Sequence, residues 1–397
     1  MESEKKTRKL RILFNTNAPW VPSGYAQQAR LILPRMAQEG FPTACIAFYG
    51  LEGGIINLDG VFFYPRMGSP WGDDAIIHHS KHFNADIVFT LQDIWTLAPE
   101  TFKTLEVSGK RLIPIVPVDH EPIPPAIFDR LRMAYRIVTY SPFGYRELKG
   151  KGMHSTYIPH AVDTNQFRRC DRAKIRERLK IPNDVFLYGM VAANKDMPPR
   201  KGFQHALDAF KMVHDKYPKT GLYFHTRLGL QGGFPIEQYA KNLGISDAIY
   251  AVDEYEHMYH IQPEDMGQVY NAMDVYLMPS LNEGFGIPLI EAQACEIPVI
   301  ATDFTAMRDL LIDGKTGFKL KVVSTKFTPL LSYVADPDTN HLTELMIKLY
   351  EMSPRERGEM GKNGRKFVQE NFEFDTVWRE KWLPFLDILE KECYPTS

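Results

Sequence analysis

The chain has 397 residues, which is long for one hydrophobic core and sufficient for two domains. Apolar residues make up 44% and charged residues 24%, a balance that excludes disordered and fibrous proteins. The formal charge of −2 provides no basic field that would recruit nucleic acid or an acidic membrane surface.

The N-terminal residues and the cysteines predict a cytoplasmic protein in a reducing compartment. The opening residues, MESEKKTRKLR, are charged and lack the apolar core of a signal peptide. No stretch approaches the roughly 18 consecutive apolar residues of a membrane span. The cysteines are scattered without a CxxC pair, so we expect buried free thiols rather than disulfides or structural zinc. They are Cys45, Cys170, Cys295 and Cys393.

Short apolar runs alternate with segments of helical period through the first half, which predicts a parallel sheet covered by helices. Strands are expected at Leu10–Asn15, Thr43–Phe48, Ile87–Leu91, Leu112–Val118 and Ile137–Tyr140. Helices are expected at Tyr25–Gln38, Glu100–Val107, Ala126–Ala134 and Phe143–Lys149.

The same alternation starts again after Pro182 and predicts a second α/β domain. Its strands are expected at Phe186–Val191, Leu222–His225, Val275–Met278 and Val299–Ala301. Its helices are expected at Phe203–Asp215, Glu237–Leu243, Glu264–Met273, Pro288–Ala294, Leu342–Glu351 and Pro354–Asn371.

The domain junction is expected in the charged segment Asp163–Ile181, which has no strand pattern. We therefore predict one domain at residues 1–165 and a second at residues 170–373. The last stretch, about 374–397, carries aromatic residues at helical spacing and is expected to pack back onto the first domain.

The stretch PSLNEGFGIPLIEAQA predicts a strand end, a glycine loop and a helix start. Gly284 and Gly286 allow close backbone approach, and Pro288 suits the first helical turn. Free N–H groups at such a turn favour a phosphate. Glu283 and Glu291 flank this anion site, where they suit sugar hydroxyls. On spacing alone, one capping and one surface glutamate remain an open alternative.

The longer stretch EGFGIPLIEAQACEIPVIATD resembles the signature of the group 1 retaining glycosyltransferases, whose two glutamates are separated by seven residues. The resemblance implies a GT-B fold, with two Rossmann-like domains facing each other across a cleft. It implies that the domain at residues 1–165 binds the acceptor and that the domain at residues 170–373 binds the nucleotide-sugar donor. It implies that Glu291 binds the ribose diol of a nucleotide sugar and that Glu283 contacts hydroxyls of the transferred sugar. The backbone facing the diphosphate and sugar would be that of Gly284, Phe285, Gly286 and Ile287.

A basic block, GMVAANKDMPPRKGF, covers Gly189–Phe203. In the family a basic pair at this place neutralises the diphosphate leaving group, which implies this role for Arg200 and Lys201. Lys195 is the ungapped match to a basic residue upstream that is usually arginine. Lysine keeps the charge but loses the bidentate fork. Without the family context, Arg200 and Lys201 would be read as a solvated helix start.

Two positions in the first half match family blocks near the donor. The stretch APWVPSGY resembles the N-terminal glycine loop, from which only Gly24 is carried over. The stretch PIVPVDHEP places His120 just after a strand, where many family members hold a histidine near the transferred sugar. A single histidine is more often structural, so its catalytic role rests on the resemblance.

The chain departs from the family pattern at several places. Glu296 occupies a position that is usually glycine, so a helix-ending turn must reach positive φ without one. Phe304, Thr305 and Ala306 replace a glycine-rich turn, which would alter contacts to the donor base. Residues Val323–Ala335 are expected to form an extra loop. The Asp-x-Asp at 336–338 lies outside the donor motif and is also read as a loop.

The resemblance implies transfer of a hexose from a nucleoside-diphosphate sugar to an acceptor hydroxyl with retained configuration, without metal or cofactor. The residues implied in catalysis are Glu283, Lys201 and His120. UDP-glucose is the first donor expected and GDP-mannose the second, from family frequency. The acceptor stays open between a glycan, a lipid-linked sugar, a metabolite, a protein side chain and a nucleic-acid base. Other GT-B enzymes, such as an epimerase or a phosphorylase, and an inactive sugar-binding or scaffold subunit remain alternatives.

Overall fold

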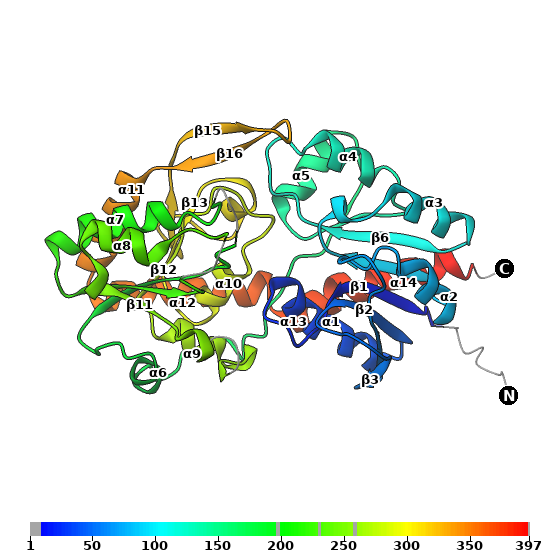
Figure 1. Ribbon diagram of the computed structural model, residues 1–397, viewed down its shortest axis with the longest axis horizontal. Helices are drawn as coiled ribbons and strands as arrows, with labels where there is room; N and C mark the ends of the chain where they lie inside the picture. The colour runs from blue at the N-terminus through cyan, green and yellow to red at the C-terminus, as the bar shows by residue number, and fades with distance from the viewer. Residues whose placement is uncertain (1–8, 196–198, 229–231, 257–259, 396–397) are drawn as a thin grey trace. The chain divides into compact units, whose positions relative to one another are not determined.

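The computed structural model of the protein describes residues 9–195, 199–228, 232–256 and 260–395 (Figure 1). The chain divides into two compact units. The first contains the described residues of Met1–Val118, Ile123–His160 and Asp375–Ser397. The second contains those of Asp119–Pro122 and Ala161–Phe374.

The first unit is built on an eight-stranded sheet in the order β3-β4-β2-β1-β5-β6-β7-β8. Its strands pair in parallel, apart from the edge strand β3, which is antiparallel to β4. The strands are β1 (Ile12–Asn17), β2 (Thr43–Tyr49), β3 (Ile56–Leu58), β4 (Val61–Tyr64), β5 (Ile87–Leu91), β6 (Arg111–Val116), β7 (Val138–Thr139) and β8 (Thr156–Tyr157).

Helices connect and cover these strands, as parallel pairing requires. They are α1 (Gly24–Gln38), α2 (Ile76–His82), α3 (Pro99–Val107), α4 (Pro125–Leu131) and α5 (Pro142–Gly150), with a 3-10 turn, η1 (Ile94–Thr96). The C-terminal segment adds a π-helical turn at Trp378–Trp382 and α14 (Leu383–Cys393). The rings of Trp382 and Phe385 lie 5.9 and 6.4 Å from that of Phe89 on β5, so this segment packs on the first sheet.

The second unit has a fully parallel six-stranded sheet in the order β11-β10-β9-β12-β13-β14. The strands are β9 (Phe186–Val191), β10 (Thr220–His225), β11 (Ile249–Ala251), β12 (Val275–Met278), β13 (Val299–Thr302) and β14 (Gly317–Leu320). The helices are α6 (Ala173–Arg178), α7 (Phe203–Lys216), α8 (Ile236–Leu243), α9 (Met266–Asn271), α10 (Ile287–Ala294), α11 (Thr339–Glu351), α12 (Pro354–Asn371) and α13 (Phe374–Val377), the last of which runs into the first unit.

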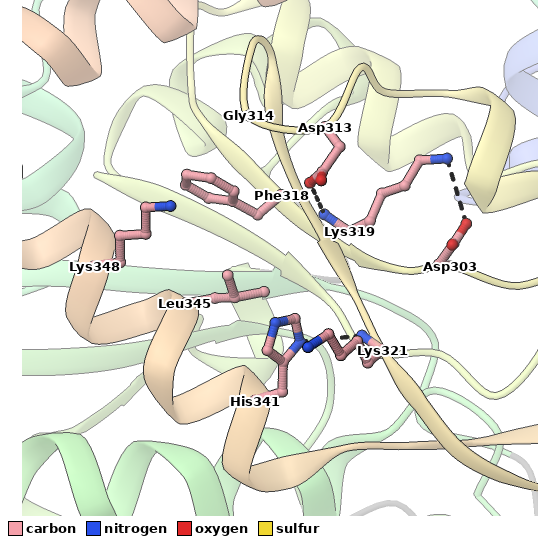
Figure 2. Close-up of a pocket in the computed structure, with 9 residues that line it drawn as sticks. All are labelled: Asp303, Asp313, Gly314, Phe318, Lys319, Lys321, His341, Leu345 and Lys348. Carbon is pink, nitrogen blue, oxygen red and sulfur yellow. Dashed lines mark hydrogen bonds and ion pairs between the residues drawn. The ribbon is translucent and has the colours of Figure 1, made fainter.

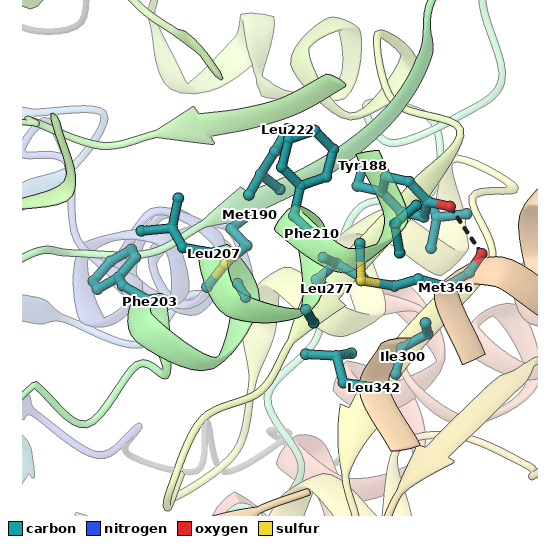
Figure 3. Packing of buried hydrophobic residues seen from close by; sticks show 14 of the residues in the cluster. Tyr188, Met190, Phe203, Leu207, Phe210, Leu222, Leu277, Ile300, Leu342 and Met346 are labelled. Carbon is teal, nitrogen blue, oxygen red and sulfur yellow. Dashed lines mark hydrogen bonds between the residues drawn. The ribbon is translucent and has the colours of Figure 1, made fainter. Parts of the chain in front are cut away.

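The core of the second unit holds α7 firmly against the sheet. Phe203, Leu207 and Phe210 are buried at helical spacing (Figure 3). The Phe210 ring lies 6.4 Å from that of Tyr188 on β9, and the Phe203 ring lies 5.9 Å from that of Phe224 on β10. The Tyr188 hydroxyl donates to the carbonyl of Met346 at 2.8 Å, which satisfies its one polar group inside the core. Because α7 is anchored in this way, the residues at its N-terminus are also held in place.

Predicted strands that lie inside the sheets are confirmed: Ile87–Leu91, Phe186–Val191 and Val275–Met278 match the structure residue for residue. Edge strands were not predicted, because short strands with one free edge carry little apolar pattern. The expectation that Val323–Ala335 forms a loop is wrong. The segment is an antiparallel hairpin of β15 (Val322–Thr328) and β16 (Ser332–Pro337), whose exposed apolar residues obscure the usual alternation.

The predictions for the cysteines, for Asp338 and for membrane spans can also be compared with the structure. All four cysteines are free; Cys45 and Cys295 are buried as expected, but Cys170 is exposed. Asp338 is not a plain loop residue, because it caps α11 by accepting from the backbone of His341. None of the described helices combines the length and apolarity that crossing a bilayer requires.

Candidate functional site

Two loops meet at the carboxyl edge of the second sheet, one after β9 and one after β12. The carbonyl of Arg200 accepts from the backbone N–H of Leu281 at 2.8 Å. Gly202 has φ of +72°, and a Cβ there would stand 1.9 Å from the carbonyl oxygen of Pro279. Only glycine fits this contact. The two backbones therefore fix Arg200 and Lys201 above the residues that follow β12.

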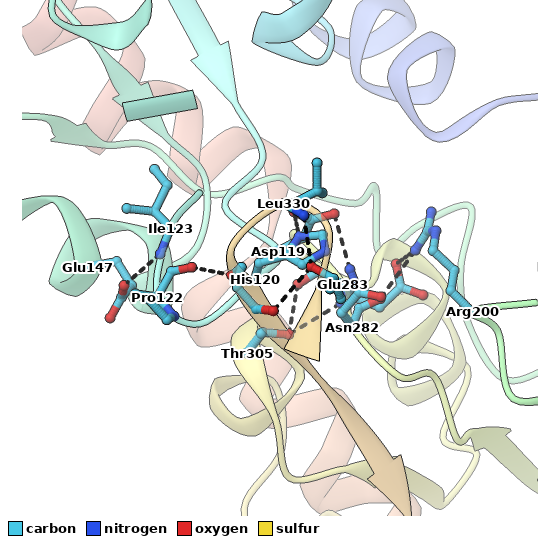
Figure 4. A network of polar contacts seen from close by, with 12 residues as sticks. Asp119, His120, Pro122, Ile123, Glu147, Arg200, Asn282, Glu283, Thr305 and Leu330 are labelled. Carbon is cyan, nitrogen blue, oxygen red and sulfur yellow. Dashed lines mark hydrogen bonds and ion pairs between the residues drawn. The ribbon is translucent and has the colours of Figure 1, made fainter. Parts of the chain in front are cut away.

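This contact places two of the predicted basic residues, Arg200 and Lys201, next to the predicted acid Glu283. The Lys201 ammonium lies 2.6 Å from Oε1 of Glu283. Arg200 lies 3.2 Å from Oε2 of the same carboxylate (Figure 4). Arg200 also donates to the carbonyl of Asn282 at 3.2 Å. The Glu283 side chain is only 10% exposed. Two cations sharing one carboxylate leave a net positive charge that can receive an anion.

The ion cluster keeps Glu283 ionised. Burial by itself would raise the pKa of Glu283, but the charges of Lys201 and Arg200 outweigh it and lower that pKa to about 2. A carboxyl group with such a pKa cannot donate a proton at neutral pH. Glu283 is therefore suited to accept hydrogen bonds from hydroxyl groups rather than to act as a general acid.

The depressed pKa of Glu283 makes stability depend on pH. Its folded pKa of about 2 lies below the ordinary value of 4.5, so the cluster stabilises the fold above pH 4.5 and loses this effect as pH falls toward 2. The full contribution is on the order of 3 kcal/mol. In urea unfolding between pH 3 and 6, the stability gap between wild type and Glu283→Gln should narrow at the acid end. An unchanged gap would show that the cluster does not lower this pKa, and exposed Glu370→Gln is the control.

The glycine loop then opens directly into α10. Gly286 has φ of +122° and precedes the helix without a side-chain cap. Within the described parts of the chain, no side chain caps the first N–H groups of α10, which a hydroxyl or carboxylate usually does. The side chains of Phe285 and Ile287 are buried, which leaves backbone as the polar part of this loop. Such a helix start favours a phosphate.

Glu291 lies within α10 and is almost fully buried. Its Oε2 accepts from the hydroxyl of Tyr270 at 2.6 Å. Burial and the charge of Glu291 raise the pKa of Tyr270 well above its ordinary value, so this hydroxyl stays a donor. Burial also raises the pKa of Tyr276, to which the charges of both Glu283 and Glu291 contribute. The two expected acids therefore lie within electrostatic reach of one buried tyrosine.

His120 belongs to the same unit through the short segment Asp119–Pro122. Its Nδ1 lies 2.7 Å from one carboxylate oxygen of Asp119, and the other accepts from Asn282 at 3.3 Å (Figure 4). The backbone N–H of Tyr333 on β16 donates to the carbonyl of Glu121 at 3.0 Å. With Asp119 as acceptor, Nδ1 carries the proton of this hydrogen bond, which fixes the orientation of the ring. Asn282 connects this pair to Glu283.

Two residues that were expected to bind the donor, Gly24 and Lys195, are not among the described members of this cluster. Gly24 begins α1 in the first unit, where the hydroxyl of Ser23 accepts from the backbone of Ala26 at 3.1 Å. Lys195 is exposed in the loop after β9. It borders residues 196–198 of the basic block, which lie outside the described residues. Their roles stay predictions.

Thr305 is a site residue that the sequence did not reveal. It is fully buried and has φ of +43°, a conformation that costs a β-branched residue energy. Its hydroxyl accepts from the backbone N–H of Glu283 at 3.2 Å and donates to the Glu283 carbonyl at 3.1 Å. The available signal was the replacement of a glycine-rich turn. Glu296, the other replaced glycine, also has positive φ, of +62°.

We expect Thr305 to position Glu283 rather than to touch substrate. Thr305→Val keeps the shape but leaves two buried backbone groups unpaired, and should lower kcat about tenfold or more. Thr305→Ser keeps the hydroxyl and should restore kcat to within about twofold. The matched control is Thr302→Val, because the Thr302 hydroxyl is buried without a hydrogen-bond partner among the described residues. Equal kcat in Thr305→Val and wild type would exclude the positioning role.

A separate pocket of about 440 Å³ lies at the edge strand β14 and contains none of the expected site residues (Figure 2). Several charged residues that line this pocket contact one another. Lys319 lies 3.4 Å from Asp303, and the Lys319 backbone donates to Asp313 at 2.9 Å. The lining residues are Asp303, Asp313, Gly314, Phe318, Lys319, Lys321, His341, Leu345 and Lys348.

Comparison with known proteins shows which sequences and folds the chain resembles. Residues 171–327 match the family "Glycosyl transferases group 1". The chain is 29% identical over 212 residues to the capsular polysaccharide biosynthesis glycosyltransferase CapM of Staphylococcus aureus, covering 53% of this chain and 48% of that protein. The chain thus spans about half the length of the curated relatives it matches.

Solved structures share the fold across both units. Sucrose-phosphate synthase from Thermosynechococcus elongatus is similar with a TM-score of 0.75 at 17% identity, covering 96% of this chain and 99% of that one. Anabaena HepE, solved with UDP and glucose, is similar with a TM-score of 0.71 at 14% identity, covering 95% and 100%. These likenesses show a GT-B fold of two Rossmann-like units. The matched segment, residues 171–327, includes the Lys201–Glu283 site, so this part of the chain is similar to the glycosyl transferases group 1 family.

Proposed function

We propose that this protein is a retaining glycosyltransferase that moves a hexose from a nucleoside-diphosphate sugar to an acceptor hydroxyl. The observation that carries the proposal is the Lys201–Glu283–Arg200 cluster at the carboxyl edge of a parallel sheet. Ligands of such sheets bind at this edge. The cluster pairs cations for a diphosphate with a carboxylate for sugar hydroxyls. The N-terminus of α10 next to it supplies backbone N–H groups.

Each part of the donor has a matching group in this arrangement. The diphosphate lies against Lys201, Arg200 and the start of α10, where charge and backbone donors favour it. Glu283 accepts from hydroxyls of the transferred sugar, as its low pKa suits. Glu291, oriented by Tyr270, accepts from the ribose diol. His120, oriented by Asp119, contacts the transferred sugar.

The reaction breaks the bond between the anomeric carbon and the diphosphate oxygen. Negative charge builds on the diphosphate as this bond opens, and Lys201 and Arg200 stabilise it there. The acceptor hydroxyl attacks the same face, and its proton passes to the departing phosphate oxygen. No carboxylate base is required. Glu283, ionised by its low pKa, cannot be the acid of a glycosidase pair.

UDP-glucose is the preferred donor in this proposal and GDP-mannose the second. The solved Anabaena protein that shares this fold holds UDP and glucose. The relative from Staphylococcus aureus is a glycosyltransferase of capsular polysaccharide biosynthesis, which is consistent with transfer of a sugar. Because lysine and arginine neutralise the leaving group, transfer should proceed at an undiminished rate in excess EDTA. Activity that is lost with EDTA and returns with manganese would contradict this metal-free mechanism.

A thermal-shift panel of nucleoside-diphosphate sugars tests the donor site. A donor at 100 times its Kd should stabilise the fold by about 2.7 kcal/mol, which raises the unfolding midpoint by several degrees. Glu291→Ala should weaken donor affinity tenfold or more and remove about half of this shift or more. Glu370→Ala, which removes an exposed acid on α12, is the control. If no nucleotide sugar raises the midpoint, or if Glu291→Ala responds like wild type, the proposed donor site is wrong.

A further inference from the structure

The first unit exposes three tryptophans at one edge of its sheet. Trp20, Trp71 and Trp95 are 41%, 40% and 53% exposed, whereas the remaining two of the chain are buried in the C-terminal segment. The three follow the carboxyl ends of strands β1, β4 and β5. Ligands of parallel α/β sheets bind at this edge, so the position of these rings is that of a binding surface.

Trp71 and Trp95 form a pair, which we call the tryptophan platform. Their ring centroids lie 5.5 Å apart at an interplanar angle of 75°. Phe48 supports Trp71 from β2 at 6.3 Å. Trp20 differs, because its indole N–H donates to the carbonyl of Gly50 at 2.7 Å. For Trp71 and Trp95, no acceptor of the indole N–H is found among the described residues, so both donors are available to a ligand.

A buried polar network fixes the backbone beneath the platform. Asn15, within β1, donates to the carbonyl of Trp71 at 3.1 Å and to the side chain of Gln92 at 3.2 Å. Gln92 in turn donates to the hydroxyl of Thr96 at 2.8 Å. Arg130 of α4 donates to the carbonyl of Trp95. The backbones of both tryptophans are thus held by hydrogen bonds, while their rings stay about half exposed. Such preorganisation lowers the conformational entropy that the protein loses when a ligand binds.

Charge around the platform selects the kind of ligand. The loops after β1, β2, β4 and β5, at 18–23, 50–55, 65–75 and 92–98, contain four acidic residues and one arginine, a net charge of −3. They are Glu52, Arg66, Asp73, Asp74 and Asp93. Arg66 is itself paired with Glu52 at 3.2 Å. Arg130 and Arg30, which donate to the carbonyls of Trp95 and Pro19, reduce the net charge to −1. This surface therefore offers no basic patch that would attract a nucleic-acid backbone or an anionic membrane, whereas a neutral ligand needs none.

We propose that the tryptophan platform binds a hexose ring of a neutral oligosaccharide, which is the acceptor of the transferred sugar. The C–H face of a pyranose packs on the electron-rich face of an indole, and its hydroxyls bond to indole N–H groups and nearby carboxylates. As the acceptor site, this assignment rests on the proposed function. Among the acceptor classes that the sequence left open, this assignment selects a neutral glycan.

Binding of neutral oligosaccharides to the full chain without donor tests the platform. Maltotetraose, cellotetraose, mannotetraose and chitotetraose are titrated while tryptophan fluorescence and heat are recorded. At least one should bind wild type, and Trp71→Ala and Trp95→Ala should each weaken that binding tenfold or more. The matched control is Phe62→Ala. Phe62 is 43% exposed on β4, but its ring lies against Phe83, which precedes the amino end of β5, and its loss should leave the affinity unchanged.

The same variants separate the platform from the donor site. Trp71→Ala and Trp95→Ala should keep the full thermal shift with a nucleotide sugar, because Lys201, Glu283 and Glu291 are intact. If the nucleotide-sugar shift is absent but tetrasaccharide binding depends on both tryptophans, the proposed function fails and the platform stands. The platform is overturned if wild type binds none of the four, or if the variants bind as wild type does. It is also overturned if a single-stranded oligonucleotide or phosphatidylglycerol vesicles bind through these tryptophans instead.

Discussion

Lys201→Ala is expected to lower the kcat of hexose transfer by about 10²–10³-fold at saturating donor. The effect is large because Lys201 is the closest cation to the buried Glu283, at 2.6 Å, and its charge opposes the charge that develops on the diphosphate. Lys201→Arg keeps the charge but not the compact ammonium, and should fall between wild type and alanine. Initial rates of nucleotide release in the presence of acceptor measure the effect.

A control on α7, the helix that begins two residues after Lys201, separates this loss from general damage to that helix. Lys211 pairs with Asp215 at 2.6 Å on the exposed face of α7, and Lys211→Ala should leave kcat within twofold of wild type. Urea unfolding of both variants checks that the fold persists. A Lys201→Ala enzyme with wild-type kcat would remove the leaving-group role from this lysine and leave the proposed mechanism without its main cation.

Gly202→Ala is expected to have the second large effect, on stability and activity together. An added Cβ would stand 1.9 Å from the Pro279 carbonyl oxygen, so the two loops that hold Lys201 against Glu283 must separate. The backbone at Gly202 also has φ of +72°, which alanine adopts only with strain. We expect a loss of about 2–4 kcal/mol in urea unfolding and a fall in kcat of tenfold or more.

Gly244 provides a matched comparison in the same unit. It has nearly the same φ, +69°, but a Cβ there would meet nothing within 4 Å. Gly244→Ala should therefore show only the conformational cost, about 1 kcal/mol, with unchanged kcat. Equal effects of the two substitutions would mean that the contact with Pro279 does not position the catalytic loop.

The sequence alone predicted the parts of the fold whose signal is local. Buried parallel strands are continuous apolar runs, so Phe186–Val191 and Val275–Met278 were located without error. The glycine loop and the proline in the first turn of α10 predicted a helix start that is confirmed. Edge strands and the hairpin of β15 and β16 were missed, because half-exposed strands carry no such run.

The order of the strands decides which of the predicted residues meet. Lys201 and Glu283 are 82 positions apart, and they touch because β12 pairs with β9 while β10 and β11 lie on the other side of β9. No periodicity along the chain reports such a crossover. Asp119 likewise accepts a hydrogen bond from Asn282, 163 positions away, a contact between residues that follow strands of different sheets.

Thr305 shows the limit of a motif most clearly. In the sequence, residues 304–306 are recognisable only as a departure from a glycine-rich pattern. Folded, its hydroxyl holds both backbone groups of Glu283, which offsets the strain of its positive φ. The sequence by itself thus determined which chemical groups the protein has and the elements that carry them. Only the tertiary structure decided their partners, because hydrogen bonds and ion pairs form between neighbours in space.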